Sequence, residues 1–124
     1  MSDPTPKDSL LTIGCQAVGI LRDVVDVFDG ATDPPRSPSW EYWEVVTMLF
    51  SDFYIEDVAR DPPKYGLPAA CSATLCEVIR RWRDFDERHR PSTDLYLQDL
   101  RANPHWSGVV DGIRAFHQVL EARA

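Results

Sequence analysis

Residues 39–61 read SWEYWEVVTMLFSDFYIEDVARD and hold two of the four tryptophans of the chain together with its densest group of acidic side chains. Large apolar residues recur here at intervals of three and four, as they do along one face of an α-helix. The spacing predicts a central helix whose inward stripe consists of Trp40, Trp43, Thr47, Phe50 and Tyr54, widened by Val46, Leu49 and Phe53. The pattern leaves open whether a break near Ser51 divides the segment into two helices.

Helical periodicity continues on both sides of this segment, and proline or glycine residues separate one periodic stretch from the next. Further stretches of this kind lie at 8–28, 68–89, 95–100 and 104–120. No alternating pattern requires a β-strand, and no internal repeat is present. The sequence therefore predicts an all-α fold, a single-domain bundle of four to five helices over residues 8–124. Pro4 and Pro6 predict a disordered N-terminus at residues 1–7.

Two of the flanking stretches allow more specific expectations. In the first, Gly14 lies on the apolar side, where the missing side chain permits a neighbouring element to approach closely. In residues 68–89, we expect an inward stripe of Cys71, Leu75, Val78, Trp82 and Phe85. The opposite face has mixed charges, and Glu77 with Arg81 and Asp84 with Arg88 are spaced four apart in the favourable order.

The length and composition are those of a small globular protein. The chain has 124 residues, of which 44% are hydrophobic, and no segment has the roughly 18 consecutive apolar residues that a membrane-spanning helix needs. Its first residues are polar and do not resemble a secretory signal. We therefore expect a cytoplasmic protein. Its three cysteines, an odd number, are expected to be reduced, buried thiols.

The charge is distributed unevenly along the chain. The net charge is −7, and all of the excess lies in residues 1–66, which hold 12 acidic and 5 basic side chains against 8 and 8 in residues 67–124. This balance argues against nucleic acid as a ligand, because phosphate binding needs a basic surface. It suits a basic protein partner that is attracted by the opposite charge, although charge of this size also serves solubility alone.

No pattern of residues predicts catalysis or a cofactor. The chain has no G-x-S-x-G motif and no glycine-rich phosphate loop, and the acidic group at Asp52, Glu56 and Asp57 suits acid–base chemistry only if one carboxylate lies in an apolar pocket. The candidate soft-metal ligands are His89, His105, His117, Cys71 and Cys76. Their spacing matches no zinc motif and no di-iron bundle, so we predict no metal site.

The central segment is also the best candidate for a binding surface. If Trp40 and Trp43 face inward, Tyr42 points about 100° away and is exposed beside two glutamates. An exposed tyrosine with charged neighbours has the composition of an interaction hot spot. The predicted partner-binding residues are Glu41, Tyr42, Glu44, Asp52, Tyr54, Glu56, Asp57 and Asp61.

The segment LFSDFYIEDVARDP, followed later by TDLYLQDLRANPHWSGVVDGIRAFHQVL, resembles small bacterial immunity proteins of polymorphic or contact-dependent toxin systems. The resemblance covers roughly residues 45–120 and implies a small, cytoplasmic, non-catalytic protein that binds a cognate toxin domain and blocks its active site. We therefore predict a protein that neutralises a basic toxin domain through its acidic helix face. The alternatives are a regulatory or structural protein that self-associates through Leu11, Gly14, Val18 and Val25, and an enzyme or metal-binding bundle.

Overall fold

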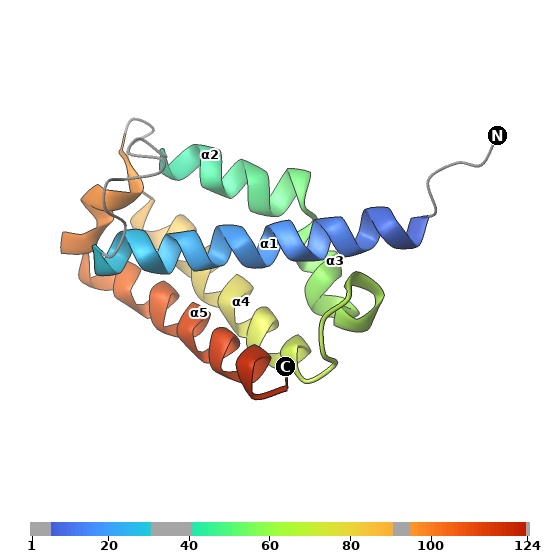
Figure 1. Cartoon of the computed structure of the whole chain (residues 1–124). Coiled ribbons are helices and arrows are strands. Elements are labelled where there is room, and N and C mark those ends of the chain that lie inside the picture. The colour runs from blue at the N-terminus through green and yellow to red at the C-terminus, as the bar shows by residue number, and fades with distance from the viewer. Residues whose placement is uncertain (1–5, 31–40, 91–94, 124) are drawn as a thin grey trace.

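The computed structural model describes residues 6–30, 41–90 and 95–123, which fold into helices without a β-strand (Figure 1). The α-helices of these residues are α1 (Pro6–Asp29), α2 (Tyr42–Thr47), α3 (Ile55–Arg60), α4 (Cys71–His89) and α5 (Pro104–Arg123). A π-helical turn η1 (Met48–Asp52) continues α2, and 3-10 turns form η2 (Pro62–Tyr65) and η3 (Leu97–Ala102). The predicted all-α class is confirmed.

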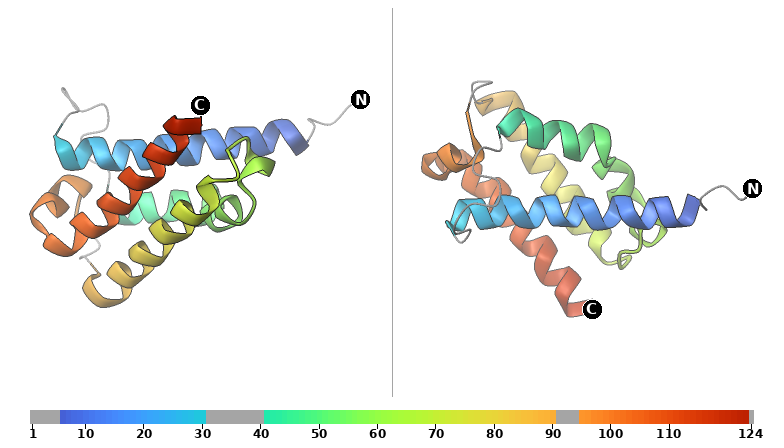
Figure 2. Two further views of the ribbon diagram at one scale, coloured as in Figure 1. Left: turned by 90° about the horizontal axis from the view of Figure 1, so that it is seen from below. Right: turned by 45° about the horizontal axis from the view of Figure 1, so that its top comes forward.

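Helices α4 and α5 run antiparallel and make the most extensive contact between elements, and α1 crosses this pair (Figures 1 and 2). Helix α2 lies on the far side of α1 from the C-terminal end of α5 (Figure 1). The buried apolar residues form one continuous cluster, to which every element contributes. Its largest members are Trp82, Trp106, Tyr42 and Phe116. All residues of the stripe predicted for α4 are buried, as expected.

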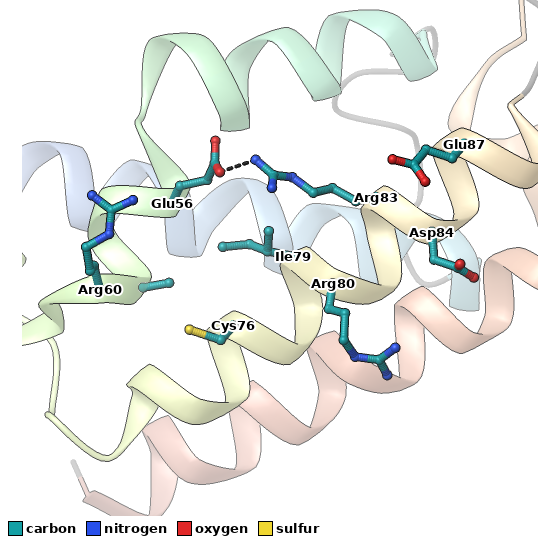
Figure 3. Close-up of a pocket in the computed structure, with 9 residues that line it drawn as sticks. Glu56, Arg60, Cys76, Ile79, Arg80, Arg83, Asp84 and Glu87 are labelled. Carbon is teal, nitrogen blue, oxygen red and sulfur yellow. Dashed lines mark hydrogen bonds and ion pairs between the residues drawn. The ribbon is translucent and has the colours of Figure 1, made fainter.

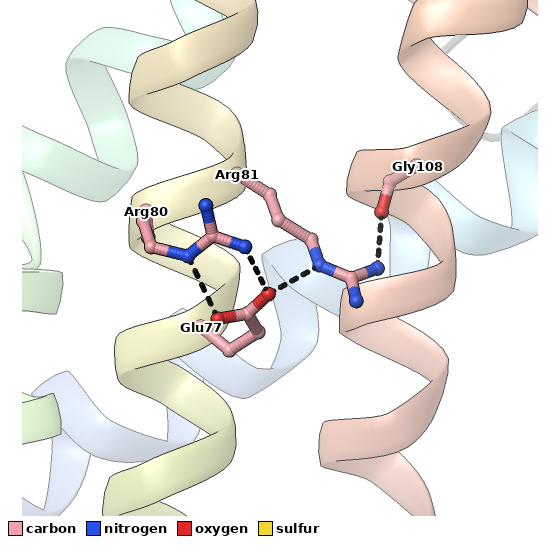
Figure 4. Close-up of polar contacts among 4 residues, drawn as sticks. All are labelled: Glu77, Arg80, Arg81 and Gly108. Atoms are coloured by element: carbon pink, nitrogen blue, oxygen red, sulfur yellow. Dashed lines mark hydrogen bonds and ion pairs between the residues drawn. The ribbon is translucent and has the colours of Figure 1, made fainter.

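Arg81 joins α4 to α5 (Figure 4). Its Nε donates to Oε2 of Glu77 at 2.7 Å, and its Nη1 donates to the carbonyl oxygen of Gly108 at 2.9 Å. Gly112 lies one turn further along α5, where a Cβ atom would stand 3.1 Å from Cδ of Arg81. Hydrogen bonds from Arg80 and Arg81 lower the pKa of Glu77 to about 2. The predicted pairing of Glu77 with Arg81 is confirmed.

Helix α1 begins earlier than expected. Its first turn includes Pro6 and residue 7, so the prediction of disorder is wrong for these two positions, and residues 1–5 lie outside the described residues. Proline is acceptable there because the first turn of a helix has no internal partner for that N–H. The prediction for Gly14 is confirmed, since a Cβ atom at this position would overlap the carbonyl oxygen of Tyr65 in η2.

The central segment forms two helices rather than one. The π-helical turn η1 follows α2 directly, and Tyr54 then adopts a left-handed conformation with φ 49° before α3 begins. Pro62 ends the segment, because a residue that precedes proline is forced out of helical geometry. The structure thus settles a question that periodicity left open.

The inward stripe predicted for this segment is right only in part: Leu49 is buried and Val46, Phe50 and Phe53 pack against the core, but Trp43, Thr47 and Tyr54 are exposed. The buried residues of α2 and η1 are Tyr42, Val45 and Leu49. Trp43 is 48% exposed, Tyr54 is 50% exposed and Thr47 is also exposed, while Trp40 lies outside the described residues. Both tryptophan and tyrosine suit an inward position, so spacing alone does not select between two adjacent aromatics. The choice is made by the residues of α4 and α5 that receive Tyr42.

Two further expectations concern the burial of the cysteines and the presence of a membrane-spanning helix. All three thiols are free, but only Cys71 is buried, so the expectation of buried thiols is wrong for Cys15 and Cys76. Burial raises the pKa of the Cys71 thiol. Within the described ranges, no helix combines the length and the apolar character that a membrane crossing requires.

Candidate functional site

The predicted binding residues separate into three groups in the structure. Tyr42 is buried, with only 2% of its surface exposed, and the prediction that it binds a partner is wrong. Glu41 and Glu56 are half-buried. The remaining residues are exposed, namely Glu44, Asp52, Tyr54, Asp57 and Asp61. Part of the predicted set is therefore exposed, and Trp43 takes the place of Tyr42 as the exposed aromatic residue of α2.

Tyr42 is held in the core by hydrogen bonds as well as by ring contacts. Its hydroxyl donates to Oδ1 of Asp86 at 2.8 Å and accepts from Nε1 of Trp82 at 3.2 Å. Its ring packs edge-on against Phe85 and Trp106, with centroid distances of 6.0 and 5.9 Å. Burial, and next the hydrogen bond to Asp86, raise the pKa of Tyr42 well above its usual range. These contacts fix α2 to α4 and leave Trp43 outside.

Trp43 and Tyr54 are the large aromatic residues that the described part of the chain exposes. Sequence reasoning placed Trp43 in the core and missed it as a surface residue. The available signal was its neighbour Tyr42, whose hydroxyl can pair with a buried polar group. Trp43 follows immediately and must then point away from the core, because adjacent residues on a helix differ by about 100° in direction.

Tyr54 lies at the junction of η1 and α3, where its backbone has φ 49° and ψ 49°. Its carbonyl oxygen accepts from the backbone N–H groups of Asp57 and Val58 at 2.9 and 3.0 Å, so the residue starts α3. A left-handed conformation is uncommon for a bulky residue, and such residues concentrate at functional sites. Single π-helical turns also occur frequently at functional sites, and η1 is such a turn shortly before Tyr54.

The carboxylates of the segment differ in how they are engaged. Glu44 Oε1 accepts from the backbone N–H of Glu41 at 3.2 Å and so caps α2. Glu56 pairs with Arg83 of α4, and Asp57 pairs with Arg60 at 3.3 Å.

Asp52 and Asp61 are exposed, and within the described ranges neither side chain forms a hydrogen bond or an ion pair. A carboxylate without a partner is the one most available to a basic ligand. We call the exposed set formed by Trp43, Glu44, Asp52, Tyr54, Asp57 and Asp61 the α2–α3 surface.

A cleft of about 520 Å³ lies beside this surface, between α3 and α4 (Figure 3). Glu56 and Arg83 reach toward one another across it, and Cys76 and Ile79 also line it. Charges of both signs surround it, and its arginines are already paired with Glu56, Asp57 and Glu77. This arrangement suits a protruding side chain of a protein partner better than a free anion.

The candidate metal ligands are dispersed. His89 and His105 stack with their ring centroids 3.6 Å apart, whereas His117 packs beside Phe116 on α5. Cys71 is in the core and Cys76 lines the cleft. Among the described residues, no three histidine, cysteine or acidic side chains are placed to hold a metal ion together.

The surface expected for self-association does not form as predicted. Gly14 is covered by Tyr65, and Val25 is only 8% exposed. Leu11 and Val18 remain accessible, and both line a separate groove beside α1.

No protein-family model matches the chain, and comparisons with curated proteins and with solved structures find no match. The fold and the site are those of a small helical protein with an exposed acidic and aromatic surface.

Proposed function

We propose that this chain is a non-enzymatic protein-binding protein that docks a basic protein through the α2–α3 surface. The observation that carries the proposal is the exposure of Trp43 (48%) and Tyr54 (50%) on a segment that also exposes Asp52, whose carboxylate has no partner among the described residues. Exposed aromatic residues supply most of the affinity at protein interfaces, and charged residues around them supply orientation and fast association.

The dimensions of the surface suit a protein rather than a small molecule. At about 1.5 Å per residue, Trp43 and Tyr54 stand roughly 15 Å apart along the segment, a span that one small ligand does not bridge. The cleft between α3 and α4 continues the surface at Glu56 and offers a place for one further side chain. The net charge of −7 favours approach of a basic partner.

The particular form that we propose is a bacterial immunity protein that acts in the cytoplasm and occludes the active site of a cognate basic toxin domain. The absence of a catalytic motif in the sequence and the unpaired carboxylate on an exposed aromatic surface support this form of the proposal. Inhibition by occlusion requires only affinity and shape, so no catalytic group is needed on this chain.

A site-specific cross-linking experiment tests the location of the surface. The photoreactive residue p-benzoylphenylalanine replaces Trp43 or Tyr54 in cells of the native host, and Gln118 on the exposed side of α5 is the matched control position. We expect the same basic protein to be cross-linked from positions 43 and 54 and not from 118. Cross-linking to one protein equally from all three positions would exclude this surface.

The identified protein is then purified and its affinity is measured. We expect Trp43→Ala to weaken binding by about 30-fold or more, the size of a hot-spot effect of about 2 kcal/mol. Asp52→Lys should slow association and reduce its dependence on salt, whereas Gln118→Ala should change neither. If the partner is a toxin, its purified activity should fall stoichiometrically as this chain is added. An interacting protein whose activity is unchanged would overturn the immunity assignment but leave the docking surface intact.

A further inference from the structure

An apolar groove of about 400 Å³ lies beside α1, and none of the residues that line it belongs to the α2–α3 surface. Its walls come from α1, from the turn after η2 and from the last turns of α5. The apolar residues that line it are Leu11, Val18, Tyr65, Leu67 and Leu120. Leu11 is 39% exposed, so part of this wall is open to water. The groove is a separate feature, and the proposed docking of a basic protein does not use it.

Arg22 is the charged residue that lines the groove, and its state differs from that of the other arginines. Among arginines whose side chains the structure describes, all the others donate to a carboxylate or to a carbonyl oxygen, namely Arg60, Arg80, Arg81, Arg83, Arg88, Arg90, Arg101 and Arg114. Within those same residues, the exposed guanidinium of Arg22 forms no hydrogen bond or ion pair. Among these residues, Arg22 is the arginine whose donors are left to water, and an acidic ligand in the groove can take the place of that water.

His117 of α5 provides an internal reporter of the charge at Arg22. Its Nε2 is buried and has no hydrogen-bond partner. The charged groups that act on it are Arg22 and Asp26 from α1 and Glu121 from its own helix. Burial lowers the pKa of His117, and the positive charge of Arg22 lowers it further.

We propose that the groove binds a single-chain aliphatic carboxylic acid, with its chain along Leu11, Val18 and Leu120 and its carboxylate against the guanidinium of Arg22. An apolar cleft with one orienting polar group is the usual form of a small-ligand site. The guanidinium presents a planar pair of donors that matches a carboxylate. One guanidinium in a chain of net charge −7 suits a monovalent head group better than a doubly charged phosphate.

The test titrates decanoate, below its micelle concentration, into the full chain and follows the imidazole signals by NMR. Decan-1-ol is the matched uncharged probe, with the same chain and no carboxylate. We expect decanoate to bind with a stoichiometry of one and to raise the pKa of His117, because it neutralises Arg22. Decan-1-ol should bind without that rise. The variant His117→Gln assigns the reporting signal.

Gly19 offers a way to fill the groove without removing a core contact. It lines the groove, and a Cβ atom added there would meet no other atom within 4 Å. We expect Gly19→Leu to weaken binding of both probes by about tenfold or more. Gly19→Ala is the matched control, because it makes a similar change in helix propensity without filling the space. Arg22→Gln should weaken decanoate binding by about tenfold and leave decan-1-ol unchanged, since it removes a charge-assisted hydrogen bond.

Each remaining outcome overturns the proposal. Decanoate that fails to saturate, or that binds Gly19→Leu as well as the unchanged chain, shows that the groove is not the site. Equal effects of Arg22→Gln on both probes would show that no carboxylate is recognised there. A chain that does not bind decanoate and is a dimer, which Gly19→Leu converts to a monomer, would show that a second copy occupies the groove.

Discussion

The segment α2–η1–α3 and the pair α4–α5 hold similar proportions of charged residues, but the segment is richer in aromatic residues and the two regions behave differently. Helices α4 and α5 are long and regular, and Arg80, Arg81 and Arg88 on the outer face of α4 pair with its own carboxylates. The α2–η1–α3 segment contains a π-helical turn, a tyrosine with φ 49° and an unpaired carboxylate at Asp52.

This difference indicates which region is available to a partner. A face whose charges already satisfy one another gains little from a new ligand, and its exposed ion pairs contribute little to stability. The α2–η1–α3 segment instead presents a tyrosine in a left-handed conformation and a half-exposed tryptophan, and neither side chain belongs to the core cluster. Residues that are retained without a structural role are the better candidates for function.

The largest effect is expected where the two regions meet, at Tyr42. Tyr42→Ala should lower the free energy of unfolding by about 3–5 kcal/mol, because it leaves a cavity between α2 and α4. Trp43→Ala, the adjacent control, should lower it by much less, because Trp43 is 48% exposed and does not belong to the core cluster. Urea unfolding measures the free energy of unfolding of both variants. Equal losses for the two variants would mean that Trp43 is packed, and the comparison would fail.

The hydroxyl of Tyr42 can be tested separately with Tyr42→Phe. This variant keeps the ring but leaves the buried Nε1 of Trp82 without its acceptor and removes one donor from Asp86. A buried group without a partner costs about 1–3 kcal/mol, and we expect a loss of that size. Thermal unfolding followed by tryptophan fluorescence provides the measurement. An unchanged stability would show that water replaces the hydroxyl.

The strain at Tyr54 predicts an effect of the opposite sign. Asparagine adopts the left-handed conformation more readily than tyrosine, so Tyr54→Asn should raise the free energy of unfolding by about 0.5–1 kcal/mol. The same variant should weaken binding of the protein partner. Phe53→Asn is not a suitable control because Phe53 packs against the core, whereas Asp52→Asn, at an exposed position, is the control for the stability measurement alone. A loss of stability in Tyr54→Asn would show that the tyrosine side chain supports the fold.

The smallest effect on stability is expected from the protonation of His117, which lies on α5. Because the folded-state pKa of His117 lies below its ordinary value of about 6.5, the unfolded chain binds the proton more strongly. The neutral His117 therefore contributes fully to stability above about pH 6.5, the pKa of the unfolded chain. This contribution is lost as the pH falls through the lower pKa of the folded state. His117→Gln should remove this part of the pH dependence in urea unfolding between pH 7 and 5. An unchanged profile would show that His117 does not contribute to the pH dependence of stability.

The recurrence of apolar residues every three or four positions was sufficient to predict the buried face of α4, whose five predicted core residues are all buried. It failed in part in residues 39–61 because this segment offers aromatic residues on every side. Periodicity also cannot place a π-helical turn, which shifts the direction of each residue that follows it. Among the predicted site residues, Asp52 and Tyr54 are exposed, as the prediction requires, whereas the sequence does not predict the exposure of Trp43.

The sequence by itself determined the class of the fold, the positions of the long helices, the close approach at Gly14 and the location of the excess negative charge. These features follow from local propensity, from apolar spacing and from composition, which need no knowledge of distant contacts. Only the tertiary structure decided that Tyr42 faces inward and Trp43 outward. The decision depends on a hydrogen bond to Asp86, 44 residues away, and on rings of α4 and α5 that the local sequence does not contain.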